Sequence, residues 1–95
     1  MLDVARIRSK ALKLFARGDA SKVNPNWRPR IRRILAALNV AADPAALDIP
    51  GFDFQELKGN RKGTYAVKAS GNWRVTYQWD ENGPFAVVLE DYHGK

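Results

Sequence analysis

The first half of the chain carries apolar residues at helical spacing. Residues 26–42 show this most clearly, because apolar side chains recur three and four positions apart and would form one buried stripe. These side chains are Ile31, Ile34, Leu35 and Leu38. Residues 9–18 predict a shorter helix that Ser9 can cap and Gly18 ends. Residues 3–7 are a candidate short first strand.

Proline positions limit where the helices begin and end. Pro29 is tolerated only in the first turn of a helix, so the main helix should begin near Asn26 or later. Residues 43–51 predict one further helical turn, capped by Asp43 and broken at Pro50.

From Phe52 onward the apolar period changes to two, which is typical of strands. The last predicted strand is apolar on both faces at Val87 and Val88, which indicates a central position in a sheet. The four predicted strands are residues 52–57, 64–70, 73–79 and 85–92.

The strand at residues 73–79 has two different faces. One face carries Trp73, Val75, Tyr77 and Trp79, and we interpret its aromatic rings as core or strand-pairing residues rather than as platforms for stacked bases. The other face is polar and positive, and it suits phosphate. Its residues are Arg74, Thr76 and Gln78, with Lys68 on the neighbouring strand.

The order of these elements predicts an α+β fold, with two N-terminal helices packed on a small, largely antiparallel sheet. A chain of 95 residues is expected to form a single domain, residues 1–95. The chain has no cysteine and one histidine, His93, so we expect no disulfide, no metal site and no cofactor. No apolar run reaches the about 18 residues of a membrane span, so we expect a cytoplasmic protein that does not bind a membrane.

Charge adds a partner class to this description. The net charge is +6, which favours a polyanion as partner. Residues 1–33 hold ten Lys and Arg against two acids, and residues 58–74 hold five bases and no acid. The arginines at the start of the main helix are either a solvated face or a surface for ribosomal RNA or an acidic protein segment.

Three sequence blocks, LKGNRKG, GNWR and DYH, together resemble a known family. The stretch ELKGNRKGTYAVKASGNWRVTYQW followed by EDYH resembles the HigB-type toxins of the RelE/ParE superfamily. The upstream segments KALKLFARG, RRILAALNVAA and LDIPG fit the same family in order and spacing. The resemblance covers nearly the whole chain and implies a RelE-like fold, in agreement with the α+β pattern.

The resemblance also implies an activity and partners. Such a toxin is a ribosome-dependent endoribonuclease that cleaves mRNA in the decoding site without a metal ion. The ribose 2′-OH attacks the adjacent phosphate and the 5′-oxygen leaves. The expected partners are the ribosome, mRNA and a cognate HigA-type helix-turn-helix antitoxin, whose complex with the toxin binds operator DNA.

The family motifs assign catalytic roles by resemblance. Lys58 in LKG and Arg74 in NWR look like stabilisers of phosphate charge. In the motif DYH, His93 is a candidate general acid, whereas Asp91 and Tyr92 orient groups or contact RNA. A lone histidine near a terminus is ordinarily solvated and unpaired, so the resemblance alone gives His93 this role.

Four further positions are candidate substrate contacts. Arg61 and Lys62 can grip the RNA backbone, and Asn72 either shapes its turn or touches substrate. Gln55 stands where many family members carry a histidine, and glutamine cannot accept a proton at neutral pH. Glu56, Asp91 or a neutral Lys58 can replace that base, or cleavage proceeds at a lower rate.

Two alternatives remain open at this stage. In one, Gln55 marks a decayed site, and the chain is a weak or idle module that binds its antitoxin and the ribosome. In the other, the chain is a gyrase-directed toxin of the ParE branch, although the terminal DYH fits the RNase branch better.

Overall fold

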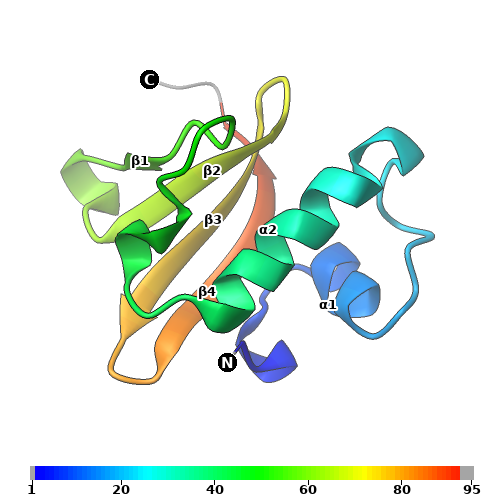
Figure 1. The fold of residues 1–95 in the computed structure, drawn as a ribbon, viewed down its shortest axis with the longest axis horizontal. Coiled ribbons are helices and arrows are strands. Elements are labelled where there is room, and N and C mark those ends of the chain that lie inside the picture. The colour runs from blue at the N-terminus through cyan, green and yellow to red at the C-terminus, as the bar shows by residue number, and fades with distance from the viewer. Residues whose placement is uncertain (1, 93–95) are drawn as a thin grey trace.

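A four-stranded antiparallel sheet forms one layer of the protein in the computed structural model, which describes residues 2–92 (Figure 1). The strands lie in the same order in space as in the chain. They are β1 (Gln55–Glu56), β2 (Thr64–Ser70), β3 (Trp73–Asp80) and β4 (Gly83–Asp91). The predicted α+β fold is therefore confirmed.

Two helices cover one face of this sheet (Figure 1). Helix α1 is Lys10–Ala16, and helix α2 is Arg28–Val40, with Pro29 in its first turn as predicted. A 3₁₀ turn, η2 (Pro25–Trp27), leads directly into α2. Within residues 2–92, none of the helices has both the length and the apolar character needed to span a membrane.

The hydrophobic core lies between α2 and the sheet. Alternation along the strands turns every second side chain of β2 and β3 toward the helices. The core receives Ile31, Ile34 and Leu38 from α2 and Val67, Val75 and Tyr77 from the sheet, all essentially inaccessible to solvent. Trp73 and Trp79 pack against this core, so the interpretation of the strand aromatics as core residues is confirmed.

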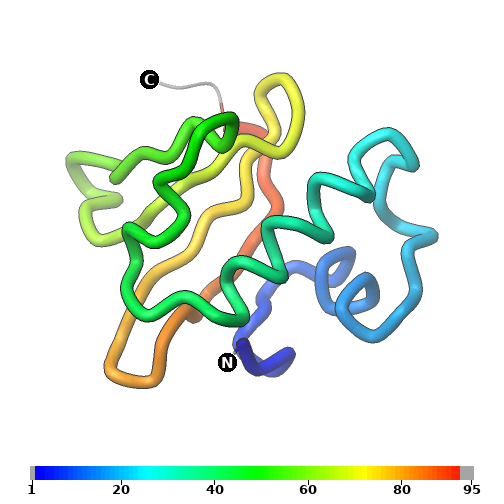
Figure 2. The backbone as a smooth tube through the Cα atoms, in the orientation of Figure 1, coloured from blue at the N-terminus to red at the C-terminus, as the bar shows by residue number. Residues whose placement is uncertain are grey.

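The predicted first strand at residues 3–7 is wrong. The Asp3 side chain accepts a hydrogen bond from the Ala5 N–H and closes a 3₁₀ turn, η1 (Val4–Arg6). Among residues 3–7, Ile7 alone forms a β-bridge to the sheet, a single parallel one to Val87 of β4. Figure 2 shows the N-terminal segment passing beside this edge of the sheet.

The predicted central position of the last strand is also wrong, because β4 is an edge strand of the sheet. Its two apolar faces have a different cause. The register shifts between Thr76 and Gln78, and Ala86 opposite this shift has a positive φ of 50°. The resulting bulge lets Val87 enter the core, while Val88 lies opposite Thr76 on the other face.

Three local predictions need smaller corrections. The strand predicted at residues 52–57 shrinks to two residues, because Asp53 adopts a positive φ of 49° and interrupts the extended backbone. Ser9 and Asp43 occupy N-cap positions, but neither side chain makes the capping hydrogen bond. The Ser9 hydroxyl instead accepts from the Leu89 N–H of β4 at 3.2 Å, which joins α1 to the sheet.

Candidate functional site

The face of the sheet opposite the helices carries polar side chains in matched rows. We call it the outer face, and the strand register defines it. Lys68, Arg74 and Glu90 are paired neighbours in one row across β2, β3 and β4. The next row holds Ala66, Thr76 and Val88. Gln55 pairs with Ala66, so the register places Gln55 in this second row, two strands and about 10 Å from Thr76.

An ion pair anchors the loop between β1 and β2 onto the outer face. Arg61, at the end of the 3₁₀ turn η4 (Gly59–Arg61), donates two parallel hydrogen bonds to the Glu90 carboxylate, at 2.7 and 2.9 Å. The Thr76 hydroxyl donates a third at 2.5 Å, and Thr76 is only 1% exposed. This bidentate geometry fixes both partners more firmly than a single contact would.

The ion pair determines the protonation of both groups. The hydrogen bonds from Arg61, and after them the one from Thr76, lower the pKa of Glu90 although partial burial raises it. The same contact raises the pKa of Arg61, and Tyr92 adds a smaller electrostatic contribution in the same direction. Glu90 is therefore held as a carboxylate at neutral pH, with Tyr92 close to the pair.

The anchored loop also carries the exposed lysines Lys58 and Lys62. They line a pocket of about 310 Å³ together with Glu56, Leu57 and Gly59. Leu57 is buried at 4% exposure and its N–H donates to the Thr64 carbonyl, so the backbone beside Lys58 is fixed on β2. The backbone that forms the pocket is therefore held in place, and the two lysine ammonium groups at its edge are exposed to solvent.

Arg74 lies near the turn between β2 and β3. Its guanidinium Nη1 donates to the carbonyls of Gly71 at 2.7 Å and Trp73 at 3.2 Å. Its Nε is buried and has no hydrogen-bond partner among the described residues. The Tyr92 N–H donates to the Asn72 carbonyl at 2.7 Å, which ties the end of β4 to the same turn.

The structure therefore gathers most of the predicted site. Arg61, Arg74, Asn72 and Tyr92 meet around the end of β4, and Lys58 and Lys62 share the loop of Arg61. Asp91, paired with Trp73, is exposed at the strand end. His93, the predicted general acid, lies outside the described residues.

Sequence reasoning missed Glu90 as part of this site. Its signal was its position directly before the DYH motif, on a strand paired with that of Arg74. The pairing depends on the bulge in β4, which the alternation of residues does not reveal. Within residues 2–92, no three carboxylate or imidazole side chains gather closely enough to hold a metal ion.

Comparison with known proteins identifies the class of protein to which this chain belongs. The family described as "RelE-like toxin of type II toxin-antitoxin system HigB" matches residues 5–93. The chain therefore belongs to the HigB-like toxins, and the predicted family membership is confirmed.

A particular relative supports the same assignment. The chain is 31% identical over 91 residues to the Endoribonuclease HigB of Proteus vulgaris, covering 95% of this chain and 99% of the relative. A toxin of a type II toxin–antitoxin system works with an antitoxin, so the protein has an antitoxin partner.

Proposed function

We propose that this chain is an endoribonuclease toxin that cleaves mRNA on the ribosome. The observation that carries the proposal is a set of cations around one ion pair. Lys58 and Lys62 line a pocket on the loop that Arg61 anchors to Glu90, and the strand register pairs Arg74 with Glu90. Two further supports are the family and the relative named an endoribonuclease. The toxin acts in the cytoplasm, and a HigA-type helix-turn-helix antitoxin restrains it and forms with it a complex that binds operator DNA.

The proposed reaction is an internal transfer at phosphorus. The ribose 2′-oxygen loses its proton and attacks the adjacent phosphorus, a 2′,3′-cyclic phosphate forms, and the 5′-oxygen leaves with a proton. Lys58 and Arg74 stabilise the additional negative charge on the phosphoryl oxygens. His93 supplies the proton to the leaving oxygen, and Asp91 and Tyr92 orient RNA at the end of β4.

Side-chain contacts to the sugar–phosphate backbone of RNA complete the proposed site. Lys62 grips a phosphate from the same pocket as Lys58, and Asn72 shapes the turn that holds Arg74. Arg61 acts mainly through its ion pair with Glu90 and presents its remaining donors to the backbone. The phosphate contacts of Lys62 and Arg61 add a salt-sensitive component to binding.

Gln55 leaves the proposed reaction without the family's histidine as general base. Alternation places Glu56 and Asp91 on the opposite side of their strands from Gln55 and Glu90. Glu90 shares the face of Gln55, but its lowered pKa makes it a weak base. We therefore propose that the 2′-OH proton passes to solvent water and that cleavage relies on the cations and the acid, at a rate below that of a site with a histidine base.

This reading predicts a gain of activity. Replacing Gln55→His should restore a base and raise the cleavage rate by about 10-fold or more, since acid–base groups typically contribute 10²–10⁴-fold. Gln78→His is the matched control. Gln78 also lies on the outer face, but it is on β3, in the row that follows Thr76. Unchanged cleavage by Gln55→His would refute the assignment of position 55.

Cleavage mapping on programmed ribosomes tests the function itself. Wild type should cut mRNA in the decoding site, and Lys58→Ala, Arg74→Ala and His93→Ala should each reduce cutting by at least about 10²-fold. Lys22→Ala, in an exposed loop remote from the site, should leave it unchanged. Intact mRNA at saturating toxin would favour an idle binding module, and inhibition of DNA supercoiling would favour a gyrase-directed toxin.

A further inference from the structure

Arg74 lies between two charged neighbours in one row of the outer face. The strand register pairs it with Lys68 of β2 on one side and with Glu90 of β4 on the other. Side chains paired in this way have Cβ atoms about 5 Å apart, and opposite charges at such positions attract each other whereas like charges repel. An arginine side chain is long enough to span this distance. The register by itself therefore favours an ion pair between Arg74 and Glu90.

The side chain of Arg74 points elsewhere. Its Nη1 donates to the carbonyls of Gly71 at 2.7 Å and Trp73 at 3.2 Å, and its buried Nε bonds to none of the described residues. No hydrogen bond or ion pair joins Arg74 to Glu90, although the structure describes both residues. The positive charge of Arg74 is therefore not neutralised by the carboxylate that stands opposite it.

Glu90 is instead engaged by Arg61, which comes from the loop between β1 and β2. Arg61 donates one hydrogen bond to each carboxylate oxygen of Glu90, and the Thr76 hydroxyl donates a further one. A bidentate contact of this kind neutralises the carboxylate and fixes its orientation. A second guanidinium approaching Glu90 would gain little attraction and would meet the like charge of Arg61. Arg61 and Arg74 thus compete for one carboxylate, and Arg61 holds it.

The other neighbour of Arg74 has a partner as well. The Nζ of Lys68 lies 4.0 Å from the carboxylate of Asp53, and the Lys68 N–H donates to the Phe52 carbonyl at 2.8 Å. Both partners precede β1, which flanks β2 on the side opposite β3. Each charged neighbour of Arg74 is therefore paired with an opposite charge of its own.

We propose that Arg61 is a positioning residue, which occupies Glu90 and thereby keeps Arg74 available to the RNA phosphate; this role rests on the function proposed above. Without Arg61, Glu90 would draw Arg74 toward β4, because hydrogen bonds to a carboxylate are stronger than those to neutral carbonyls. Arg74 would then lie along the sheet with its charge neutralised, and it would stabilise the phosphoryl oxygens less.

Rescue of one variant by a second substitution separates this role from simple anchoring of the loop. Arg61→Ala breaks the ion pair and leaves an ionised Glu90 beside Arg74. Adding Glu90→Gln removes that charge, while the loop stays unanchored and any contact of Arg61 with RNA stays absent. On programmed ribosomes, the double variant should cleave mRNA about 3–10-fold faster than Arg61→Ala. Loop anchoring alone predicts no such gain, and a double variant no faster than Arg61→Ala would overturn the proposal.

Side-chain ¹⁵N NMR of the free protein follows Arg74 without any cleavage. The Arg74 Nε–H resonance, assigned by its loss in Arg74→Lys, should shift in Arg61→Ala because the guanidinium exchanges carbonyl partners for a carboxylate. It should return to its wild-type position in the double variant, and the same spectra show whether each variant is folded. An unchanged resonance in Arg61→Ala would overturn the proposal, since any rescue would then reflect direct repulsion between Glu90 and RNA. If wild type cleaves no mRNA, the proposed function fails, and the resonance still decides whether Arg61 keeps Arg74 away from Glu90.

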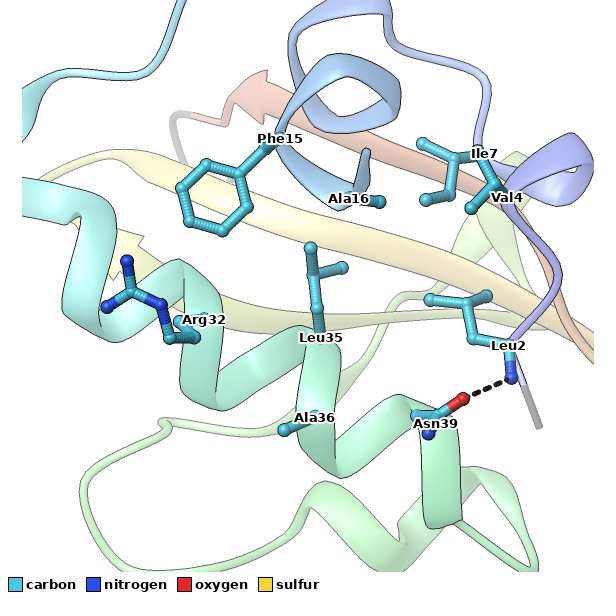
Figure 3. Close-up of a pocket in the computed structure, with 9 residues that line it drawn as sticks. All are labelled: Leu2, Val4, Ile7, Phe15, Ala16, Arg32, Leu35, Ala36 and Asn39. Atoms are coloured by element: carbon cyan, nitrogen blue, oxygen red, sulfur yellow. Dashed lines mark hydrogen bonds between the residues drawn. The ribbon is translucent and has the colours of Figure 1, made fainter. Parts of the chain in front are cut away.

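Two controls separate this effect from a change in net charge. Glu81→Gln, in the exposed turn between β3 and β4, restores the net charge of Arg61→Ala without altering Glu90 and should give no rescue. Arg32→Ala removes a cation on the helix side of the sheet. Figure 3 shows Arg32 on α2, in the pocket between the helices and the N-terminal segment, and its guanidinium lies 5.8 Å from the centre of the Phe15 ring. Glu90→Gln should not raise the cleavage of Arg32→Ala, and rescue in either control would contradict the proposal.

Discussion

Glu90 is predicted to hold the lysine-bearing loop in place, and Glu90→Gln tests this directly. The substitution keeps the size of the side chain and removes its charge. It leaves Arg61 without its carboxylate and replaces one acceptor oxygen by an amide nitrogen, which cannot accept from Arg61 or Thr76. We expect lower stability and a looser loop around Lys58 and Lys62.

The magnitude follows from the contacts and their exposure. A hydrogen bond to a charged group contributes about 1.5–3 kcal/mol. The Arg61 and Glu90 side chains are 39% and 25% exposed, so solvent screening reduces this contribution. We therefore expect a loss of about 1–2 kcal/mol for Glu90→Gln. In a domain of this size that corresponds to a decrease in Tm of about 5–15 °C.

The assay is thermal unfolding followed by circular dichroism between pH 7 and pH 3, with Glu81→Gln in the exposed β3–β4 turn as control. The pKa of Glu90 is lowered in the folded state, so its stabilisation is present above the unfolded pKa of about 4.3 and is lost as pH falls through the folded pKa. The difference between wild type and Glu90→Gln should therefore shrink below about pH 4. A difference that stays constant down to pH 3 would refute this reasoning.

Two other buried side chains give further predictions. Tyr77→Phe removes the hydrogen bond to the Pro44 carbonyl at 2.8 Å and should lower the free energy of unfolding by about 1 kcal/mol in denaturant titration. Burial raises the pKa of Tyr77, so wild type should lose stability above about pH 10 more steeply than Tyr77→Phe, and parallel pH profiles would contradict this. Leu38→Ala in the core should cost about 2–5 kcal/mol, whereas Val40→Ala, at 79% exposure, should change stability by less than about 0.5 kcal/mol.

Local periodicity was sufficient to predict the elements whose side chains repeat regularly. The predicted helix at 26–42 contains α2, and the predicted strand at 73–79 differs from β3 by one residue. Prediction failed where long-range contacts decide the structure. Ser9 has the local features of a helix cap, yet its hydroxyl bonds to the Leu89 amide, 80 residues along the chain.

In the candidate site, too, the local sequence predicted which residues take part, whereas long-range contacts determine how they are held. Motifs identified Lys58, Arg61 and Arg74 as cationic groups, but not how each is held. Whether an arginine faces substrate or a carboxylate depends on cross-strand register, and the bulge at Ala86 sets that register in β4. Alternation alone therefore could not pair Arg61 with Glu90.

The ion pair changes the charge that the outer face would offer to RNA in the proposed function. A carboxylate close to a bound phosphate would repel it, and the lowered pKa of Glu90 keeps this carboxylate ionised at neutral pH. Arg61 neutralises that charge locally through its two hydrogen bonds. In the proposed complex with RNA, net attraction would come from Lys58, Lys62 and Arg74, while the pair fixes the loop that carries both lysines. We therefore propose that Arg61 contributes to phosphate recognition mainly by positioning these lysines and by keeping Arg74 available, so that its loss should disturb cleavage more than it weakens the salt dependence of binding.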